Sequence, residues 1–173
     1  MADQQKHEAD FASRHRAREL AAQMIYSLDM HPGQDLETAL DLFLEEEGIG
    51  EAELPEAKDY CRFLTRGAWE RHAEVDDLLL RVVTGWRPER MVSVDRAILR
   101  LMIFEGFLRR ELPLRSAIAE AVEMARVFGT DNSARFVNGV LARVMKHLFP
   151  DAVRFVEEIP PGESPQKEKG FES

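Results

Sequence analysis

The 173-residue sequence has little cysteine, and Cys61 is its single thiol, so no disulfide can form within the chain. One thiol fits a reducing compartment, and we expect a cytoplasmic protein. The sequence also lacks an apolar run long enough to span a bilayer, and it lacks the apolar core of a signal peptide at its N-terminus. We therefore expect no association with membranes.

Patterns that carry enzyme chemistry are also missing. The five histidines are scattered, and none has another histidine, cysteine or acid at the spacing of a strong metal-binding motif. There is no glycine-rich phosphate loop and no nucleophile elbow. We predict a protein that is not an enzyme and has no metal and no cofactor, so that its function comes from its surfaces.

Positive charge is in deficit. Lysine and arginine total 23 against 32 acidic residues, and the net charge is −9. Nucleic-acid-binding proteins usually show an excess of lysine and arginine. Any contact with nucleic acid must therefore be local, or depend on a partner.

Apolar residues at helical spacing are abundant, whereas alternation typical of strands is rare. We predict an all-α protein of about seven helices, arranged as two small bundles packed together. A flexible tail is expected over 1–12 and a mostly disordered tail over 150–173, the latter with a short helix at Val153–Glu158. The single domain, 13–149, divides into subdomains at about 13–83 and 86–149, with Trp86 between them.

Caps and breakers give the expected helix limits. The first helix is predicted from a Ser13 cap to about Met30, with core positions at Ala17, Leu20, Ala21, Met24 and Leu28. The next four are predicted from Leu36 to a stop at Gly48 and Gly50, from Pro55 onward, over Ala73–Val83, and after a Ser93 cap. The last of these is apolar on most sides, which indicates a central, buried helix.

The stretch 114–148 contains two further helices that meet at Gly129. We expect Gly129 to take the left-handed conformation that ends a helix and Asp131 to cap the next one. Gly139 lies inside this last helix, at a cost of roughly 1 kcal/mol relative to alanine, which close helix packing would explain. Ala119 lies on the first helix of the pair.

Three polar residues and one aromatic residue crowd the first turn of the last helix: Asn132, Ser133, Arg135 and Phe136. Free backbone N–H groups at a helix start favour anions, and an arginine there opposes the helix dipole. Fold stability therefore does not explain Arg135, whereas a phosphate-bearing partner does.

Two other charged runs each allow two interpretations. Arg14, Arg16 and Arg18, at the start of the first helix, are either a solvated basic turn or a contact surface for an anion. The acids of the fourth helix are either a solubilising face or a docking face for a basic partner. These acids are Glu74, Asp76 and Asp77.

Four segments resemble the NusB family of bacterial transcription antitermination factors. They are RHRARELAAQMIY (14–26), VDRAILRLMIF (94–104), AIAEAVEMARVFG (117–129) and SARFVNGVL (133–141). Together they span 14–148, nearly the whole predicted domain, and the combination is specific. The resemblance implies the NusB-like form of the all-α fold.

The resemblance also implies a function. NusB proteins bind the boxA element of ribosomal RNA leaders, usually with the small-subunit ribosomal protein NusE, and join an RNA polymerase complex that suppresses premature termination. It implies that the basic start of the first helix binds RNA, and that Tyr26 lies near the RNA or ribosomal-protein surface. The expected RNA-binding residues are Arg14, His15, Arg16, Arg18, Tyr26, Asn132, Ser133, Arg135, Phe136 and Asn138.

Three positions depart from the family pattern. His15 replaces a frequent arginine, so one fixed charge becomes dependent on pH. Asn132 replaces a frequent aspartate, which should strengthen phosphate binding. Ala119 replaces a frequent asparagine, whose amide is either structural or a partner contact.

Two rival functions remain. One is an RNA-binding accessory module for a separate rRNA-modifying enzyme, since the same helical domain occurs fused to ribosomal RNA methyltransferases. The other is a helical protein–protein interaction module without an RNA role, which could include a homodimer.

Overall fold

The computed structural model describes residues 2–46 and 55–151, with side chains from Asp10 onward and, in the second part, from Glu56 onward. This part of the chain is all-α, as predicted, and contains seven α-helices, a 3₁₀ turn and a π-helical turn. The elements are α1 (Ala2–Met30), α2 (Leu36–Glu46), α3 (Pro55–Glu70), α4 (His72–Val82), η1 (Pro88–Arg90), α5 (Ser93–Met102), η2 (Ile103–Leu108), α6 (Leu114–Phe128) and α7 (Ser133–Leu148).

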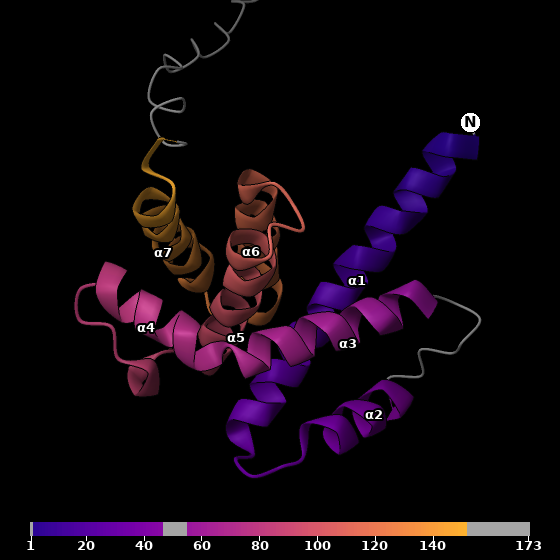
Figure 1. The fold of residues 1–173 in the computed structure, drawn as a ribbon, viewed down its shortest axis with the longest axis horizontal. Helices are drawn as coiled ribbons and strands as arrows, with labels where there is room; N and C mark the ends of the chain where they lie inside the picture. Colours follow the sequence, from indigo (N-terminus) through magenta and orange to yellow (C-terminus); the bar gives the residue numbers. More distant parts are fainter. Residues whose placement is uncertain (1, 47–54, 152–173) are drawn as a thin grey trace, which may run out of the picture.

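The helix α5 lies at the centre and packs against α1, α3, α4, α6 and α7 (Figure 1). The long helix α1 packs against α3 and α5, while α6 pairs with α7. The N-terminal end of α1 projects away from the other helices (Figure 1). In space α4 lies mainly against α7, although the sequence division grouped it with the first three helices.

The predicted core positions of α1 are confirmed, since all five side chains are buried. Trp86 is also buried. The segment formed by α5 and η2 is enclosed on all sides, as its composition predicted, and it carries four charged residues into the interior: Asp95, Arg96, Arg100 and Glu105.

Ion pairs compensate the buried arginines of α5. Arg100 donates to Asp29 of α1 at 3.0 Å and to Asp76 of α4 at 2.6 Å. Arg96 also pairs with Asp29 and donates to the carbonyl oxygen of Pro88. These contacts hold the end of α1 and the middle of α4 against the central helix.

Several predicted boundaries are wrong. The helix α1 begins at Ala2, and Ser13 is a buried residue inside it, so Ser13 does not cap this helix. Ser93 is the first residue of α5, whose capping position is Val92. Pro55 does begin α3. Gly48, Gly50 and the predicted helix at 153–158 lie outside the described residues.

Two glycines act differently from the prediction. Gly129 has φ −93°, so it is not left-handed. Glycine is needed there because an added Cβ would lie 2.4 Å from the Cβ of Ser133. Gly139 is exposed, with nothing within 4 Å of an added Cβ, so close helix packing does not explain it.

No helix in the described ranges combines the length and the apolar character that crossing a membrane requires.

Candidate nucleic-acid interface

The basic residues at 14–18 point in different directions. Successive residues of an α-helix are about 100° apart, so neighbours in sequence diverge in space. The guanidinium of Arg14 lies 4.9 Å from the ring centre of Tyr60 on α3, and 3.6 Å from the carboxylate of Asp10. His15 instead faces α6, where its Nδ1 is 2.9 Å from Glu120.

Arg18 is buried, with 4% of its surface exposed. Its Nε and Nη2 donate to the carboxylate of Glu105 at 2.8–3.0 Å, and Glu105 also accepts a 2.6 Å hydrogen bond from Tyr60. Burial alone lowers the pKa of Arg18, but Glu105 outweighs it and raises that pKa, so the side chain stays charged. The prediction that Arg18 contacts RNA is therefore wrong, because its guanidinium is committed to an internal carboxylate.

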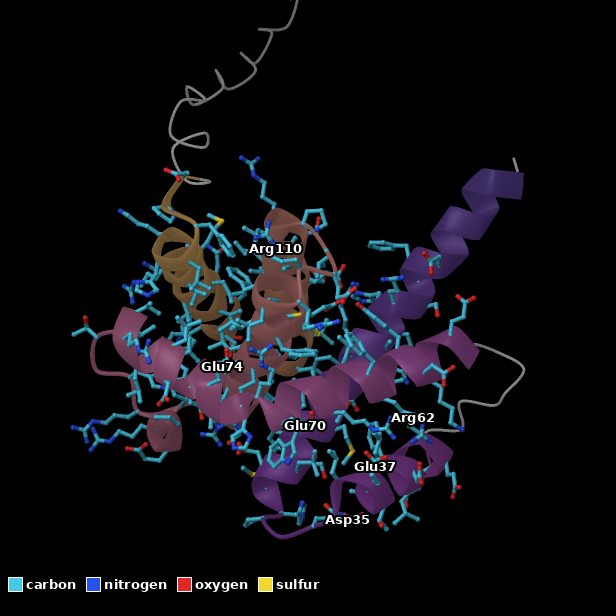
Figure 2. The ribbon with its side chains drawn as sticks, in the orientation of Figure 1. Asp35, Glu37, Arg62, Glu70, Glu74 and Arg110 are labelled. Atoms are coloured by element: carbon cyan, nitrogen blue, oxygen red, sulfur yellow. The ribbon has the colours of Figure 1, made fainter. Side chains whose placement is uncertain are left out.

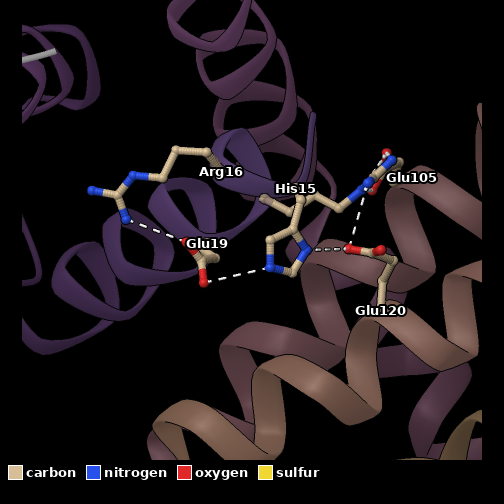
Figure 3. Close-up of polar contacts among 6 residues, drawn as sticks. His15, Arg16, Glu19, Glu105 and Glu120 are labelled. Carbon is tan, nitrogen blue, oxygen red and sulfur yellow. Dashed lines mark hydrogen bonds and ion pairs between the residues drawn. The ribbon is translucent and has the colours of Figure 1, made fainter. Parts of the chain in front are cut away.

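Two carboxylates, those of Glu19 and Glu120, lie near His15 and Arg16 (Figure 3). Glu19 accepts a 3.3 Å hydrogen bond from Arg16 and lies 3.6 Å from Nε2 of His15. Glu120 lies 2.9 Å from His15 (Figure 3) and 3.5 Å from Arg18. Partly exposed ion pairs are worth about 0–1 kcal/mol, so a phosphate group can compete for Arg16 at little cost.

The start of α7 contains both structural and exposed side chains. Ser133 is 1% exposed, its hydroxyl oxygen accepts the N–H of Thr130 at 2.9 Å, and it hydrogen-bonds to the buried carboxylate of Asp95. Burial raises the pKa of Asp95, and this hydrogen bond offsets part of the rise. The predicted RNA contact by Ser133 is wrong, because its hydroxyl fixes the turn before α7.

The other predicted residues of α7 remain accessible. Asn132, Arg135 and Asn138 are exposed, while Phe136 is half-buried and packs against the core. The capping position is Asn132, without a side-chain cap, and not Asp131 as predicted. Asn132, Arg135 and Phe136, at spacings of three and four, share one face. Ala119, which departs from the family pattern, is exposed on α6.

A pocket lies between α1, α2, α5 and the end of α6. It has a volume of about 340 Å³. Tyr26, 39% exposed, lies on its rim beside Gln23, and Phe128 at the end of α6 forms part of its wall. Phe43, Val94 and Ile98 supply the rest of its apolar lining. Sequence analysis missed Gln23 and Phe128, although Gln23 lies three residues before Tyr26, which is one helical turn.

The accessible candidates on α1 and around the start of α7 are grouped under one name, the α1–α7 strip. It consists of Arg16, Gln23 and Tyr26 of α1 with Asn132, which precedes α7, and Arg135, Phe136 and Asn138 of α7. The distance from Arg16 to Tyr26 along the helix axis is about 15 Å, at 1.5 Å per residue. The strip has the length of a bound strand rather than that of a small-molecule site.

Of the three acids proposed for a partner, Asp76 is unsuited because it pairs with the buried Arg100. Glu74 is exposed and pairs with Arg71 at 2.7 Å, and Asp77 is exposed. Both line a hollow with Leu78, Leu108 and Leu148.

Within the described ranges, no three His, Cys, Asp or Glu side chains come together as a possible metal site.

The described part of the chain is an all-helical protein. Its α1–α7 strip presents exposed polar groups at the start of α7 and along the long helix α1. A family model of the NusB family matches residues 15–146, and the chain belongs to this family. Curated relatives are named transcription antitermination protein NusB. One from Symbiobacterium thermophilum is 41% identical over 140 residues, covering 79% of this chain and 91% of the relative. Another from Carboxydothermus hydrogenoformans is 37% identical over 138 residues, covering 79% and 94%.

Solved structures share the fold. T. maritima NusB is 32% identical, with a TM-score of 0.70, covering 80% of this chain and 94% of that one. A crystal structure of the antitermination factors NusB and NusE in complex with dsRNA contains a chain that is 23% identical, with a TM-score of 0.69, covering 79% and 98%. At that identity the second likeness shows the fold alone.

Proposed function

We propose that this protein is a transcription antitermination factor that binds the boxA RNA of ribosomal RNA leaders together with the ribosomal protein NusE, and that the complex joins RNA polymerase and prevents premature termination. Membership of the NusB family and the names of the curated relatives support this role.

The observation that carries the proposal is Arg135 at the start of α7. It is exposed within the first turn, where a cation opposes the helix dipole and free N–H groups favour an anion. Phosphate contacts position RNA without reading sequence, whereas reading requires unstacked bases held by aromatic or amide groups. Tyr26, Gln23 and Asn132 offer such groups on the same strip.

Arg135→Glu gives a sharp test because its two expected effects have opposite signs. An acid at this position favours the helix dipole and should stabilise the fold by about 0.3–1 kcal/mol. The same change should weaken RNA binding and reduce the salt slope by about 0.7 for each phosphate that Arg135 neutralises. Arg143→Glu, also exposed on α7 but two turns further on, is the matched control.

The measurement is a titration of a boxA-like single-stranded RNA with protein, with and without NusE, at several salt concentrations. Equal loss of affinity in both variants would point to a general charge effect and remove Arg135 from the mechanism. Wild-type protein that binds no RNA, alone or with NusE, would overturn the proposed function.

A basic protein partner such as NusE is matched in charge by Glu74 and Asp77 on α4. Opposite charges speed and orient association, mainly through the on-rate. E74K/D77K should therefore slow association with NusE, whereas E45K/E46K, an equal charge change on α2, should have less effect. Sedimentation of the free protein would show whether a homodimer competes with this complex.

A further inference from the structure

The backbone is unusual where the central helix ends. The N–H of Arg109 bonds to the carbonyl of Phe104 at 2.9 Å, five residues back, and the N–H of Glu111 bonds to Glu105 at 3.1 Å. Among the described residues, Arg110 is the non-glycine residue with a positive φ, 60°. A left-handed conformation costs roughly 1–2 kcal/mol for a residue with a Cβ. π-helical turns and such outliers concentrate at functional sites.

This turn directs two adjacent arginines to two different aromatic rings. The guanidinium of Arg109 lies 5.7 Å from the ring centre of Phe63 on α3, and that of Arg110 lies 4.5 Å from the ring centre of Phe149. Arg109 has half of its side chain exposed, and its ion pair with Glu111 is long, at 3.5 Å. Its charge is therefore weakly neutralised.

Arg109 closes one side of a hollow of about 640 Å³ on the outer face of α3. We call this hollow the α3 groove. Its lining includes the buried Phe104, which packs closely against Gly67, since a Cβ added there would lie 2.0 Å from the ring. Its charged lining consists of Arg62, Arg66, Arg71 and Arg109 with Asp59 and Glu70. Arginine thus exceeds acid in this groove, the reverse of the balance over the whole chain.

Carboxylates from neighbouring turns hold three of these arginines. Arg66 pairs with Glu37 of α2, and Arg62 lies 2.6 Å from Asp41, also on α2. Arg71 pairs with Glu74 of α4 at 2.7 Å. Figure 2 shows Arg62 close to Glu37. In the same view Glu70 lies further along α3. Each guanidinium has five donors, and these pairs use only some of them, so the arginines can also contact a phosphate.

The α3 groove adjoins the basic residues at 14–18, in the middle of α1. A second hollow, lined by Arg14, Ser13 and Tyr60, shares Asp59 and Phe63 with it. Tyr60 and Phe63 stack with ring centres 5.7 Å apart. Asp10, Glu56 and Asp59 make the second hollow acidic, so phosphate contacts are expected at the Arg109 end.

We propose that the α3 groove is a second RNA-binding surface, which holds a single-stranded segment flanking the one bound at the α1–α7 strip. The inference rests on the proposed function. Partly buried Phe63 places an aromatic ring in the groove and the arginines offer phosphate contacts, and single-strand binders combine these two kinds of group. From Asp59 to Arg71 the groove follows α3 for about 18 Å, at 1.5 Å per residue. An extended strand fits this shape better than an isolated phosphate does.

The test compares two labelled single-stranded RNAs by fluorescence anisotropy over a range of salt. The short RNA contains only the boxA-like segment, and the long RNA adds flanking nucleotides on both sides. The variant R66Q/R109Q removes two groove charges without introducing repulsion. R81Q, which neutralises an exposed arginine of α4 outside the groove, is the matched control.

Wild-type protein should bind the long RNA more tightly and with a steeper salt slope. R66Q/R109Q should lower that slope by about 1.4, which is 0.7 for each of two phosphates no longer neutralised, and leave the short RNA unaffected. R81Q should match the wild type. Thermal melting checks the fold. If the double variant is unstable, R109Q alone replaces it, since this change loses the long contact with Glu111 and the contact with the Phe63 ring.

Equal binding of the short and long RNAs, with no effect of R66Q/R109Q, would overturn the α3 groove while the proposed function stands. Absence of binding to either RNA, with and without NusE, would overturn both the α3 groove and the proposed function. Poly-glutamate is the third probe. Poly-glutamate could bind the wild type and fail to bind R66Q/R109Q, while both proteins bind the long RNA equally well. That result would show that the groove takes an acidic protein segment, and it would overturn the RNA assignment.

Discussion

Arg18 and Glu105 form a bidentate ion pair in the interior, although 87 positions separate them in sequence. Glu105 has no exposed surface, and Tyr60 supplies a third hydrogen bond to its carboxylate. The pair therefore joins α1, α3 and η2. Among the three arginines of this part of α1, Arg18 stabilises the fold, whereas Arg14 and Arg16 lie at the surface.

The first prediction concerns the stability of this pair. Arg18→Met should lower the free energy of unfolding by about 3–5 kcal/mol, because it leaves the Glu105 carboxylate buried without a counter-ion. R18M/E105M should recover most of the loss, since it removes both charges. Guanidinium chloride denaturation of the two variants measures this difference. A single variant that costs less than about 1 kcal/mol would show that Glu105 finds another partner.

Acid sensitivity should come in part from Asp29. Burial opposes its ionisation, but hydrogen bonds from Arg96 and Arg100 lower its pKa. The folded pKa thus lies below the unfolded value of about 3.9, so the stabilisation is complete above that value and is lost as the pH falls through the folded pKa. Asp29→Asn should lower the free energy of unfolding by about 3 kcal/mol at neutral pH. The variant should also lose less stability than the wild type as the pH falls.

Urea denaturation between acidic and neutral pH provides this comparison. Asp77→Asn, an exposed carboxylate on the adjoining α4, is the control and should follow the wild-type curve. Parallel curves for the wild type and Asp29→Asn would show that Asp29 is not the group whose protonation weakens the fold.

The sequence predicted the helices well because apolar spacing and breakers act locally. The ion pair of Arg18 with Glu105 was not predicted, because Glu105 is distant in sequence. A signal was nevertheless present, since Arg18, Ala21, Ala22 and Ile25 follow the spacing of a buried stripe. A glutamate inside an otherwise apolar helix also requires a buried partner.

The site was only partly predictable for a similar reason. Arg135 could be identified from its position against the helix dipole, which is a local property. The roles of Ser133 and Gly129 could not, because the first depends on Asp95 from another helix and the second on the distance to Ser133. The pocket beside Tyr26 likewise depends on four helices coming together.

Two helical glycines should respond to alanine in opposite ways. Gly67→Ala places a Cβ 2.0 Å from the Phe104 ring, so the ring or the helix must shift. Overpacking of this kind costs about 1–3 kcal/mol. Gly139→Ala meets nothing within 4 Å and should stabilise α7 by about 1 kcal/mol. Thermal melting of both variants gives the comparison, and two changes of the same sign would contradict it.

Gly139→Ala also bears on function, because Gly139 adjoins Asn138 on the exposed side of α7. If a strand approaches the backbone there, the more stable variant should bind RNA less tightly than the wild type. Unchanged affinity would mean that the glycine has no role in binding, and its presence would then have no explanation in packing either.

The single cysteine should report on opening of the core. Cys61 has no exposed surface, and burial raises the pKa of its thiol to about 11. At neutral pH the thiol is therefore protonated and inaccessible, so a reagent such as Ellman's reagent should react only through an opened state. Arg18→Met should accelerate labelling by roughly 10²–10⁴-fold, the factor that corresponds to about 3–5 kcal/mol. Rapid labelling of the wild type, at the rate of a free thiol, would contradict this, as would a rate that Arg18→Met leaves unchanged. The second result would show that the packing of α1 on α3 opens without breaking the Arg18–Glu105 pair.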